Sequence, residues 1–102
     1  MNGDELGELR AVAARHPSIK IFVFGSTVYG KRPAHDLDLF LIYTSSEALD
    51  AVLRDLDSLP FAPLLDLTMM TPVESEQSGF IGRSRAVSLD DVRPTTERTA
   101  PL

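Results

Sequence analysis

Two aspartates, Asp36 and Asp38, open a segment that otherwise has the character of a buried strand. This segment, DLDLFLIY at residues 36–43, is short and rich in leucine, isoleucine and aromatic residues, as is typical of a β-strand. Because side chains alternate between the two faces of a strand, both carboxylates are expected on the same face. Two like charges at this spacing repel, and a divalent cation is the usual means of neutralising them. The pair therefore predicts a metal site, with Mg²⁺ as the preferred ion.

The rest of the chain alternates between helical and extended patterns. Helical patterns are found at residues 4–15, 26–30, 46–59 and 72–83, and strand patterns at 19–25, 36–43, 64–70 and 85–89. Such an alternation predicts an α/β fold in which helices flank a sheet, and it leaves the relative directions of the strands open. A chain of 102 residues fits one domain, predicted over residues 1–89. Residues 90–102 lack periodicity and contain two prolines, which predicts a flexible C-terminal tail.

A third acid, Asp66, is the only polar residue within the segment PLLDL. If its strand lies beside residues 36–43, Asp66 would join Asp36 and Asp38. Three carboxylates around one or two Mg²⁺ ions would serve an in-line displacement at a phosphate, with Asp66 placed to take the proton of an attacking hydroxyl. A structural role for Asp66, bonded to backbone or to an arginine, stays open.

The residues between the first two strands predict a phosphate site. Gly25 lets a backbone approach a phosphate closely, and the hydroxyl of Ser26 with the free N–H groups of a helix start would bind an anion. Lys31 and Arg32 follow on the loop, where either would reach a triphosphate. The alternatives are a plain turn at Gly25 and solvated surface charges at Lys31 and Arg32. For the acids, the alternative is an Asp36 that only caps a turn and an Asp38 at a solvated strand edge.

The span GSTVYGKRPAHDLDL combines a glycine-serine pair with a D-x-D motif nine residues later. In this it resembles the polymerase β-like nucleotidyltransferase superfamily, and in particular its minimal nucleotidyltransferases (MNT). The resemblance implies a mixed α/β (α+β) fold with about four strands flanked by helices. By motif position, it assigns the nucleotide phosphates to Gly25 and Ser26 and the metal to Asp36, Asp38 and Asp66.

The same resemblance implies an activity and a partner. The activity is Mg²⁺-dependent transfer of a nucleoside monophosphate from an NTP, with ATP expected, to a hydroxyl. MNT proteins are often antitoxins paired with a small helical HEPN toxin, and some adenylylate a tyrosine of that toxin. A second chain, either such a toxin or a further copy, is therefore expected to complete the site. The alternatives are an inactive module that binds a helical partner and an aminoglycoside-type enzyme that modifies a small molecule.

Composition bears on whether the protein binds nucleic acid, crosses a membrane or is secreted. The formal net charge of −5 lacks the basic excess of proteins that bind nucleic acid, so no direct nucleic-acid binding is expected. No apolar run approaches the roughly 20 residues of a membrane helix. The acidic start of the chain and the absence of cysteine lead us to expect a cytoplasmic protein.

Overall fold

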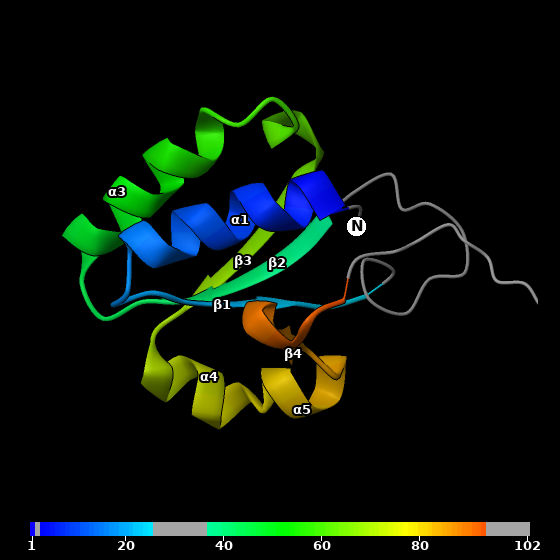
Figure 1. Cartoon of the computed structure of the whole chain (residues 1–102). Coiled ribbons are helices and arrows are strands. Elements are labelled where there is room, and N and C mark those ends of the chain that lie inside the picture. The colour runs from blue at the N-terminus through cyan, green and yellow to red at the C-terminus, as the bar shows by residue number, and fades with distance from the viewer. Residues whose placement is uncertain (2, 26–36, 94–102) are drawn as a thin grey trace, which may run out of the picture.

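A mixed sheet organises the part of the chain that the computed structural model describes, namely residues 1, 3–25 and 37–93. Its four strands stand in the order β3-β2-β1-β4 (Figure 1). Their bounds are Lys20–Val23 for β1, Leu37–Ile42 for β2, Leu65–Met70 for β3 and Val87–Ser88 for β4. β1 is antiparallel to both β2 and β4, whereas β2 and β3 are parallel. The mixed sheet implied by the resemblance is thereby confirmed.

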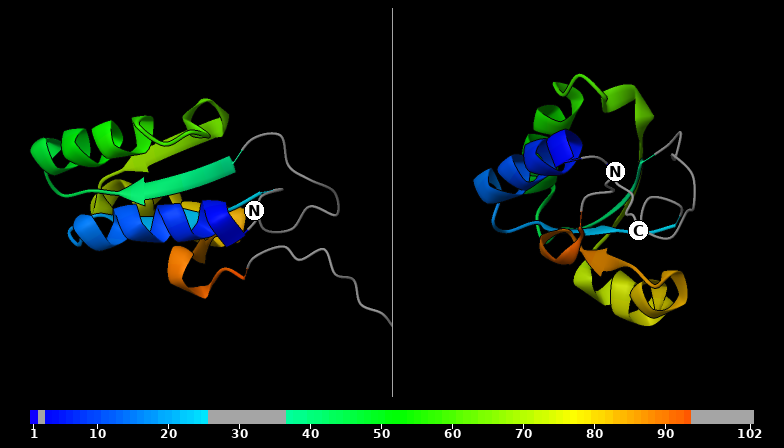
Figure 2. Two further views of the ribbon diagram at one scale, coloured as in Figure 1. Left: turned by 45° about the horizontal axis from the view of Figure 1, so that its top comes forward. Right: turned by 45° about the vertical axis from the view of Figure 1, so that its right-hand side comes forward.

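Two helices, α1 (Gly3–Arg15) and α3 (Ser46–Asp57), cover one face of this sheet (Figures 1 and 2). The main core lies between these helices and the sheet, because the apolar stripe of each helix meets the inward side chains of β1 and β2. Its most deeply buried members are Leu9, Val12, Val23, Leu39, Leu41, Val52 and Leu56. The hydroxyl of Ser45 accepts a hydrogen bond from the backbone N–H of Ala48 at 3.1 Å, which fixes the start of α3.

An ion pair ties the end of α1 to α3. Nε of Arg15 donates to Oδ2 of Asp55 at 2.9 Å, and Nε2 of His16 lies 2.9 Å from the same oxygen. The hydrogen bond from Arg15, followed by that with His16, lowers the pKa of the Asp55 carboxyl. The same carboxylate raises the pKa of the Arg15 guanidinium.

Two short helices, α4 (Pro72–Ser78) and α5 (Phe80–Ser84), lie against the other face. The sequence predicts one helix across residues 72–83, and this prediction is wrong at Gly79. Gly79 adopts a left-handed conformation with φ of 64°, which ends α4 and redirects the chain. The start of α4 is fixed by a capping box, in which Thr71 and Glu74 exchange side-chain to backbone hydrogen bonds of 2.9 and 3.2 Å.

Aromatic rings fill the space between α5 and the sheet. The ring of Phe80 lies 4.6 Å from that of Phe40 on β2 and makes an edge contact of 5.1 Å with Phe24. Phe22 on β1 lies 6.0 Å from Phe40. These four rings form a second, smaller core on the face of the sheet opposite the main core.

Arg10 links α1 to the last described residues of the chain. Its guanidinium donates to the carbonyl oxygens of Leu89 at 3.2 and 3.3 Å, Asp90 at 3.2 Å and Val92 at 2.6 Å. These carbonyls belong to a 3-10 turn, Leu89–Asp91, and to the residue after it. Leu89 and Val92 are themselves buried in the main core, so packing against α1 continues past residue 89. No helix in the described ranges is both long and apolar enough to cross a membrane.

Candidate functional site

Two aspartates lie side by side on the parallel strands β2 and β3. Asp38 and Asp66 are register partners, and residues so paired on neighbouring strands are separated by about 5 Å. Both alternate with core leucines that face α1 and α3, so their carboxylates project on the opposite face, the one that α4 and α5 partly cover. The third strand therefore does lie beside the second, as the sequence-based hypothesis of a joint acidic site requires.

The sheet order gives these two acids different surroundings. β2 is an interior strand, flanked by β1 and β3, and Asp38 is half-buried on it. β3 is an edge strand, and Asp66 is exposed. Within the described part of the chain, the Asp66 carboxylate makes no hydrogen bond or ion pair. The alternative of a structural acid, bonded to backbone or to an arginine, thus finds no support among these residues.

The end of β1 brings Gly25 against Asp38. The backbone N–H of Phe24 donates to the carbonyl oxygen of Asp38 at 3.1 Å, which continues the antiparallel pairing of β1 and β2. Gly25 then turns with φ of 67°. A Cβ atom on residue 25 would lie 2.6 Å from Oδ2 of Asp38, closer than real Cβ atoms approach any atom. Glycine is required here both by the dihedral angle and by the neighbouring carboxylate.

Four of the predicted site residues lie outside the described residues. These are Ser26, Lys31, Arg32 and Asp36, and their roles stay predictions. In the described ranges, no group of three or more histidine, aspartate or glutamate side chains could hold a metal ion. Of the three predicted acids, Asp38 and Asp66 belong to these ranges.

The described donor set fits a hard divalent cation. Mg²⁺ prefers oxygen ligands and is typically bound through one or two carboxylates together with substrate phosphates. Asp38 and Asp66 offer two carboxylates on one face and on adjacent strands. Gly25 leaves space beside them that a side chain would fill. The geometry therefore suits a site that holds a metal and a phosphate group at the same end of the sheet.

The sequence did not predict the contact between aromatic rings next to the candidate site. Phe24 precedes Gly25 directly, and its ring is held by Phe80 from α5. The pattern indicated only that Phe24 belongs to a strand and Phe80 to a helix. A contact between residues so distant in the sequence has no local signal, and it depends on the break at Gly79.

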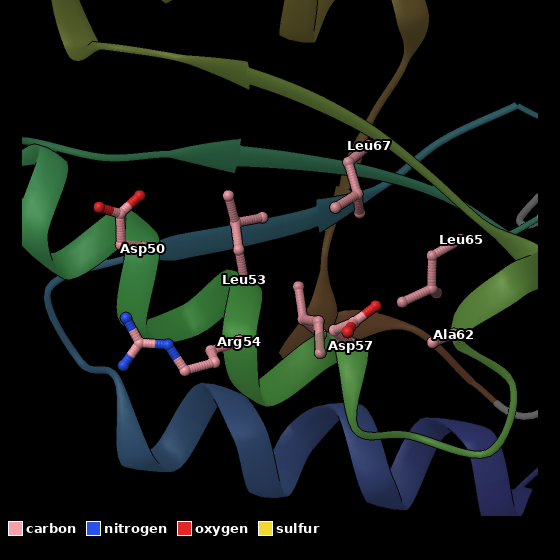
Figure 3. Close-up of a pocket in the computed structure, with 8 residues that line it drawn as sticks. Asp50, Leu53, Arg54, Asp57, Ala62, Leu65 and Leu67 are labelled. Atoms are coloured by element: carbon pink, nitrogen blue, oxygen red, sulfur yellow. The ribbon is translucent and has the colours of Figure 1, made fainter.

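A surface hollow of about 570 Å³ lies elsewhere, between α3 and β3 (Figure 3). Leu53, Leu65 and Leu67 supply its apolar lining, and Asp50, Arg54 and Asp57 of α3 stand around it. Leu65 and Leu67 alternate with Asp66 along β3, so the hollow is on the opposite face of the sheet from the acids. It is not part of the candidate site.

Comparison with known families identifies this arrangement. The nucleotidyltransferase domain family matches residues 9–83, a range that contains Gly25, Asp38 and Asp66 and all of β1, β2 and β3. A comparison with curated proteins finds no match. The family match covers most of the chain, and the mixed sheet flanked by helices is the fold expected of such a domain. The chain therefore belongs to the nucleotidyltransferase domain family of the polymerase β-like superfamily.

Proposed function

We propose that this nucleotidyltransferase domain acts with Mg²⁺ to transfer a nucleoside monophosphate from an NTP, with ATP as the expected donor, to an acceptor hydroxyl. The observation that carries the proposal is the in-register pair of Asp38 and Asp66 against Gly25. A module that only binds a partner has no need of a glycine packed against a half-buried carboxylate. Two carboxylates on one face of adjacent strands are a typical ligand pair for a divalent cation.

The reaction forms a bond between the acceptor oxygen and the α-phosphorus, while the bond from that phosphorus to the β-phosphate oxygen breaks. Pyrophosphate leaves with the electron pair of the broken bond. The bound metal would neutralise charge on the phosphates. We assign the acceptor's proton to Asp66, because its side chain is exposed on the face of the sheet, where an acceptor has access. Asp38 is assigned to hold the metal together with Asp66 and with Asp36.

The remaining assignments concern the phosphates. Gly25 permits close approach of a phosphate group to the end of β1. Ser26, Lys31 and Arg32 follow Gly25 in the sequence and are proposed to bind the phosphates of the NTP.

We further propose that the acceptor is a protein. The exposed carboxylate of Asp66 leaves room for a second protein chain to present a hydroxyl to it. A small helical toxin of the HEPN type, modified on a tyrosine hydroxyl, is the partner that the MNT resemblance suggests. In this role the protein would be the antitoxin.

Calorimetric titration with ATP tests the nucleotide site. The full chain is titrated in Mg²⁺ and again in EDTA, beside Asp38→Asn and the control Asp90→Asn, an exposed acid outside the site. We expect Mg²⁺-dependent binding in the wild type and the control, and its loss in Asp38→Asn. Equal binding by Asp38→Asn would contradict the assigned site.

The protein acceptor is tested separately. The chain is incubated with ATP, Mg²⁺ and a candidate partner, namely a short helical protein sought among the products of neighbouring genes, and the masses of the products are measured by mass spectrometry. We expect one AMP group on a tyrosine of the partner. A partner that stays unmodified, while ATP binds normally, would exclude the antitoxin assignment and leave the nucleotide site intact.

A further inference from the structure

Among the residues that the structure describes, the strand β3 is an edge of the sheet with no strand paired on its outer side. All six of its residues, Leu65–Met70, pair in regular register with β2, so it contains no bulge. Its only charge is Asp66, and it contains no lysine or proline. The opposite edge, β4, is only two residues long. A long, regular edge with little charge is a template on which another strand can pair, and proteins usually protect such edges.

Apolar side chains are exposed along this edge. The exposed large hydrophobic residues of the described ranges are Leu64 at 40%, Met69 at 40% and Val73 at 60%. Leu64 lies just before β3, Met69 lies within β3, and Val73 lies in the first turn of α4. No residue of β3 is buried, although almost every residue of the neighbouring β2 is. The hollow of Figure 3 lies beside the same strand, where Leu65 and Leu67 are only partly covered.

The pattern of β3 suits antiparallel pairing with a second copy of itself. A twofold axis perpendicular to the sheet keeps each face of the joined sheet continuous. Residues directly opposite each other must therefore have their side chains on the same face. A register centred on Asp66 would place two carboxylates directly opposite each other. One centred on Leu67 would leave them as diagonal neighbours, about 7–8 Å apart. Both arrangements are unfavourable for like charges.

A register centred on Thr68 avoids this repulsion. It pairs Leu67 with Met69 of the partner subunit, an apolar contact that occurs twice. It sets Thr68 opposite Thr68 of the partner subunit, and threonine pairs of this kind stabilise sheets. Asp66 then faces Met70 of the partner subunit at the end of the paired segment, where the two acids are farthest apart.

We propose that the protein forms a twofold-symmetric dimer in which β3 pairs with β3 of a second copy in the register centred on Thr68. The formal net charge of −5 opposes self-association in general, and residues 67–70 offer an uncharged stretch where two copies can meet. Closed twofold dimers are the commonest homo-oligomers, and this contact uses the same patch of both copies. The proposal does not depend on nucleotidyl transfer.

Disulfide trapping tests the register. The chain contains no cysteine, so Thr68→Cys introduces a single thiol. Opposed residues on paired strands have Cβ atoms about 4.5–5.5 Å apart, near the range that a disulfide spans. We expect mild oxidation to convert Thr68→Cys largely to a covalent dimer. The control Thr44→Cys, an exposed residue beyond the end of β2, is expected to stay mainly monomeric.

Sedimentation equilibrium of the full chain without cysteine gives a second measurement. We expect a dimer whose Kd rises at least about tenfold in Met69→Lys. The matched control Ala11→Lys, at an exposed position on α1, should leave the Kd unchanged. A monomer at every concentration would overturn the proposal and indicate that another segment or another protein covers β3. A dimer that is insensitive to Met69→Lys and untrapped by Thr68→Cys would overturn it as well, since the interface would lie elsewhere.

Discussion

Oδ2 of Asp38 lies only 2.6 Å from the point where residue 25 would carry a Cβ atom. The Asp38 carboxylate therefore occupies space that the side chain of any other residue at position 25 would need. The end of β1 and the start of β2 meet here because the two strands are antiparallel. A residue assigned to the nucleotide phosphates and a residue assigned to the metal are thus held together by the sheet itself.

Gly25→Ala is expected to cost more stability than Gly79→Ala. Both glycines have positive φ, of 67° and 64°, and an alanine in this conformation costs about 1–2 kcal/mol. At Gly79 an added Cβ meets no atom within 4 Å, whereas at Gly25 it meets Asp38. Urea unfolding of both variants measures the difference. Equal losses would show that the Asp38 carboxylate moves aside without cost.

The same two variants separate stability from nucleotide binding. We expect Gly25→Ala to lose Mg²⁺-dependent ATP binding, because Asp38 must shift to admit the methyl group. Gly79→Ala should bind ATP normally under conditions in which it is folded. Calorimetric titration gives this comparison directly.

Asp66→Asn is expected to abolish most activity at almost no cost in stability. The side chain is exposed, so the free energy of unfolding should change by no more than about 0.5 kcal/mol. Loss of the assigned proton acceptor should slow transfer by at least about 100-fold. Transfer from labelled ATP and urea unfolding provide the two readouts, with Asp57→Asn, an exposed acid on α3, as control. Full activity in Asp66→Asn would remove Asp66 from the reaction.

Arg10→Met is expected to lower the free energy of unfolding, because residues 89–92 lose their hydrogen bonds to α1. The guanidinium satisfies three backbone carbonyls beyond β4, and hydrogen bonds from a charged donor contribute about 1.5–3 kcal/mol in favourable cases. We expect a loss of about 1–3 kcal/mol in urea unfolding. Arg10→Lys should recover only part of it, because an ammonium lacks the planar fork that reaches several carbonyls. Full recovery by lysine would mean that charge alone matters at this position.

Asp55→Asn is expected to destabilise the protein at neutral but not at strongly acidic pH. The pKa of Asp55 is lowered in the folded chain, mainly by the hydrogen bond from Arg15. A lowered carboxyl pKa stabilises the fold at pH above the unfolded value, and this contribution is lost as pH falls through the folded value. The difference in unfolding free energy between wild type and Asp55→Asn should therefore be constant at about pH 5–6 and shrink below about pH 4.

The control for this pH series is Asp50→Asn, an exposed acid on the same helix. Its difference from wild type should not follow that of Asp55→Asn. A difference at Asp55 that persists unchanged into acid would show that the side chain acts through packing rather than through its charge.

The sequence contained strong local signals for the strands and for α1 and α3. The acids were visible because aspartate is unusual within the apolar runs around Leu39 and Leu67. The parallel direction of β2 and β3 was not readable, since it depends on how a helix-containing connection crosses the sheet. The resemblance to a known family implied a mixed sheet without saying which strands are parallel, and the structure shows that β2 and β3 are. With the strand order in hand, the adjacency of Asp38 and Asp66 follows from the register alone.

Other features depend on contacts that no local pattern encodes. The conformation of Gly79 was hidden because glycine occurs in helices as well as at their ends. The contact of Gly25 with Asp38 required knowing that β1 and β2 are antiparallel neighbours. The local pattern around Arg10 contains no sign of its three carbonyl partners, because they lie about 80 positions away along the chain.

The left-handed turn at Gly79 also allows a short segment to cover the face of the sheet opposite α1 and α3. An unbroken helix over residues 72–84 would run about 20 Å in one direction and would shield a single strip. Divided into α4 and α5, the same residues change direction, and Phe80 contacts both Phe40 on β2 and Phe24 just after β1. A compact catalytic fold of this size thus gains its second layer from a change of direction at one residue rather than from added length.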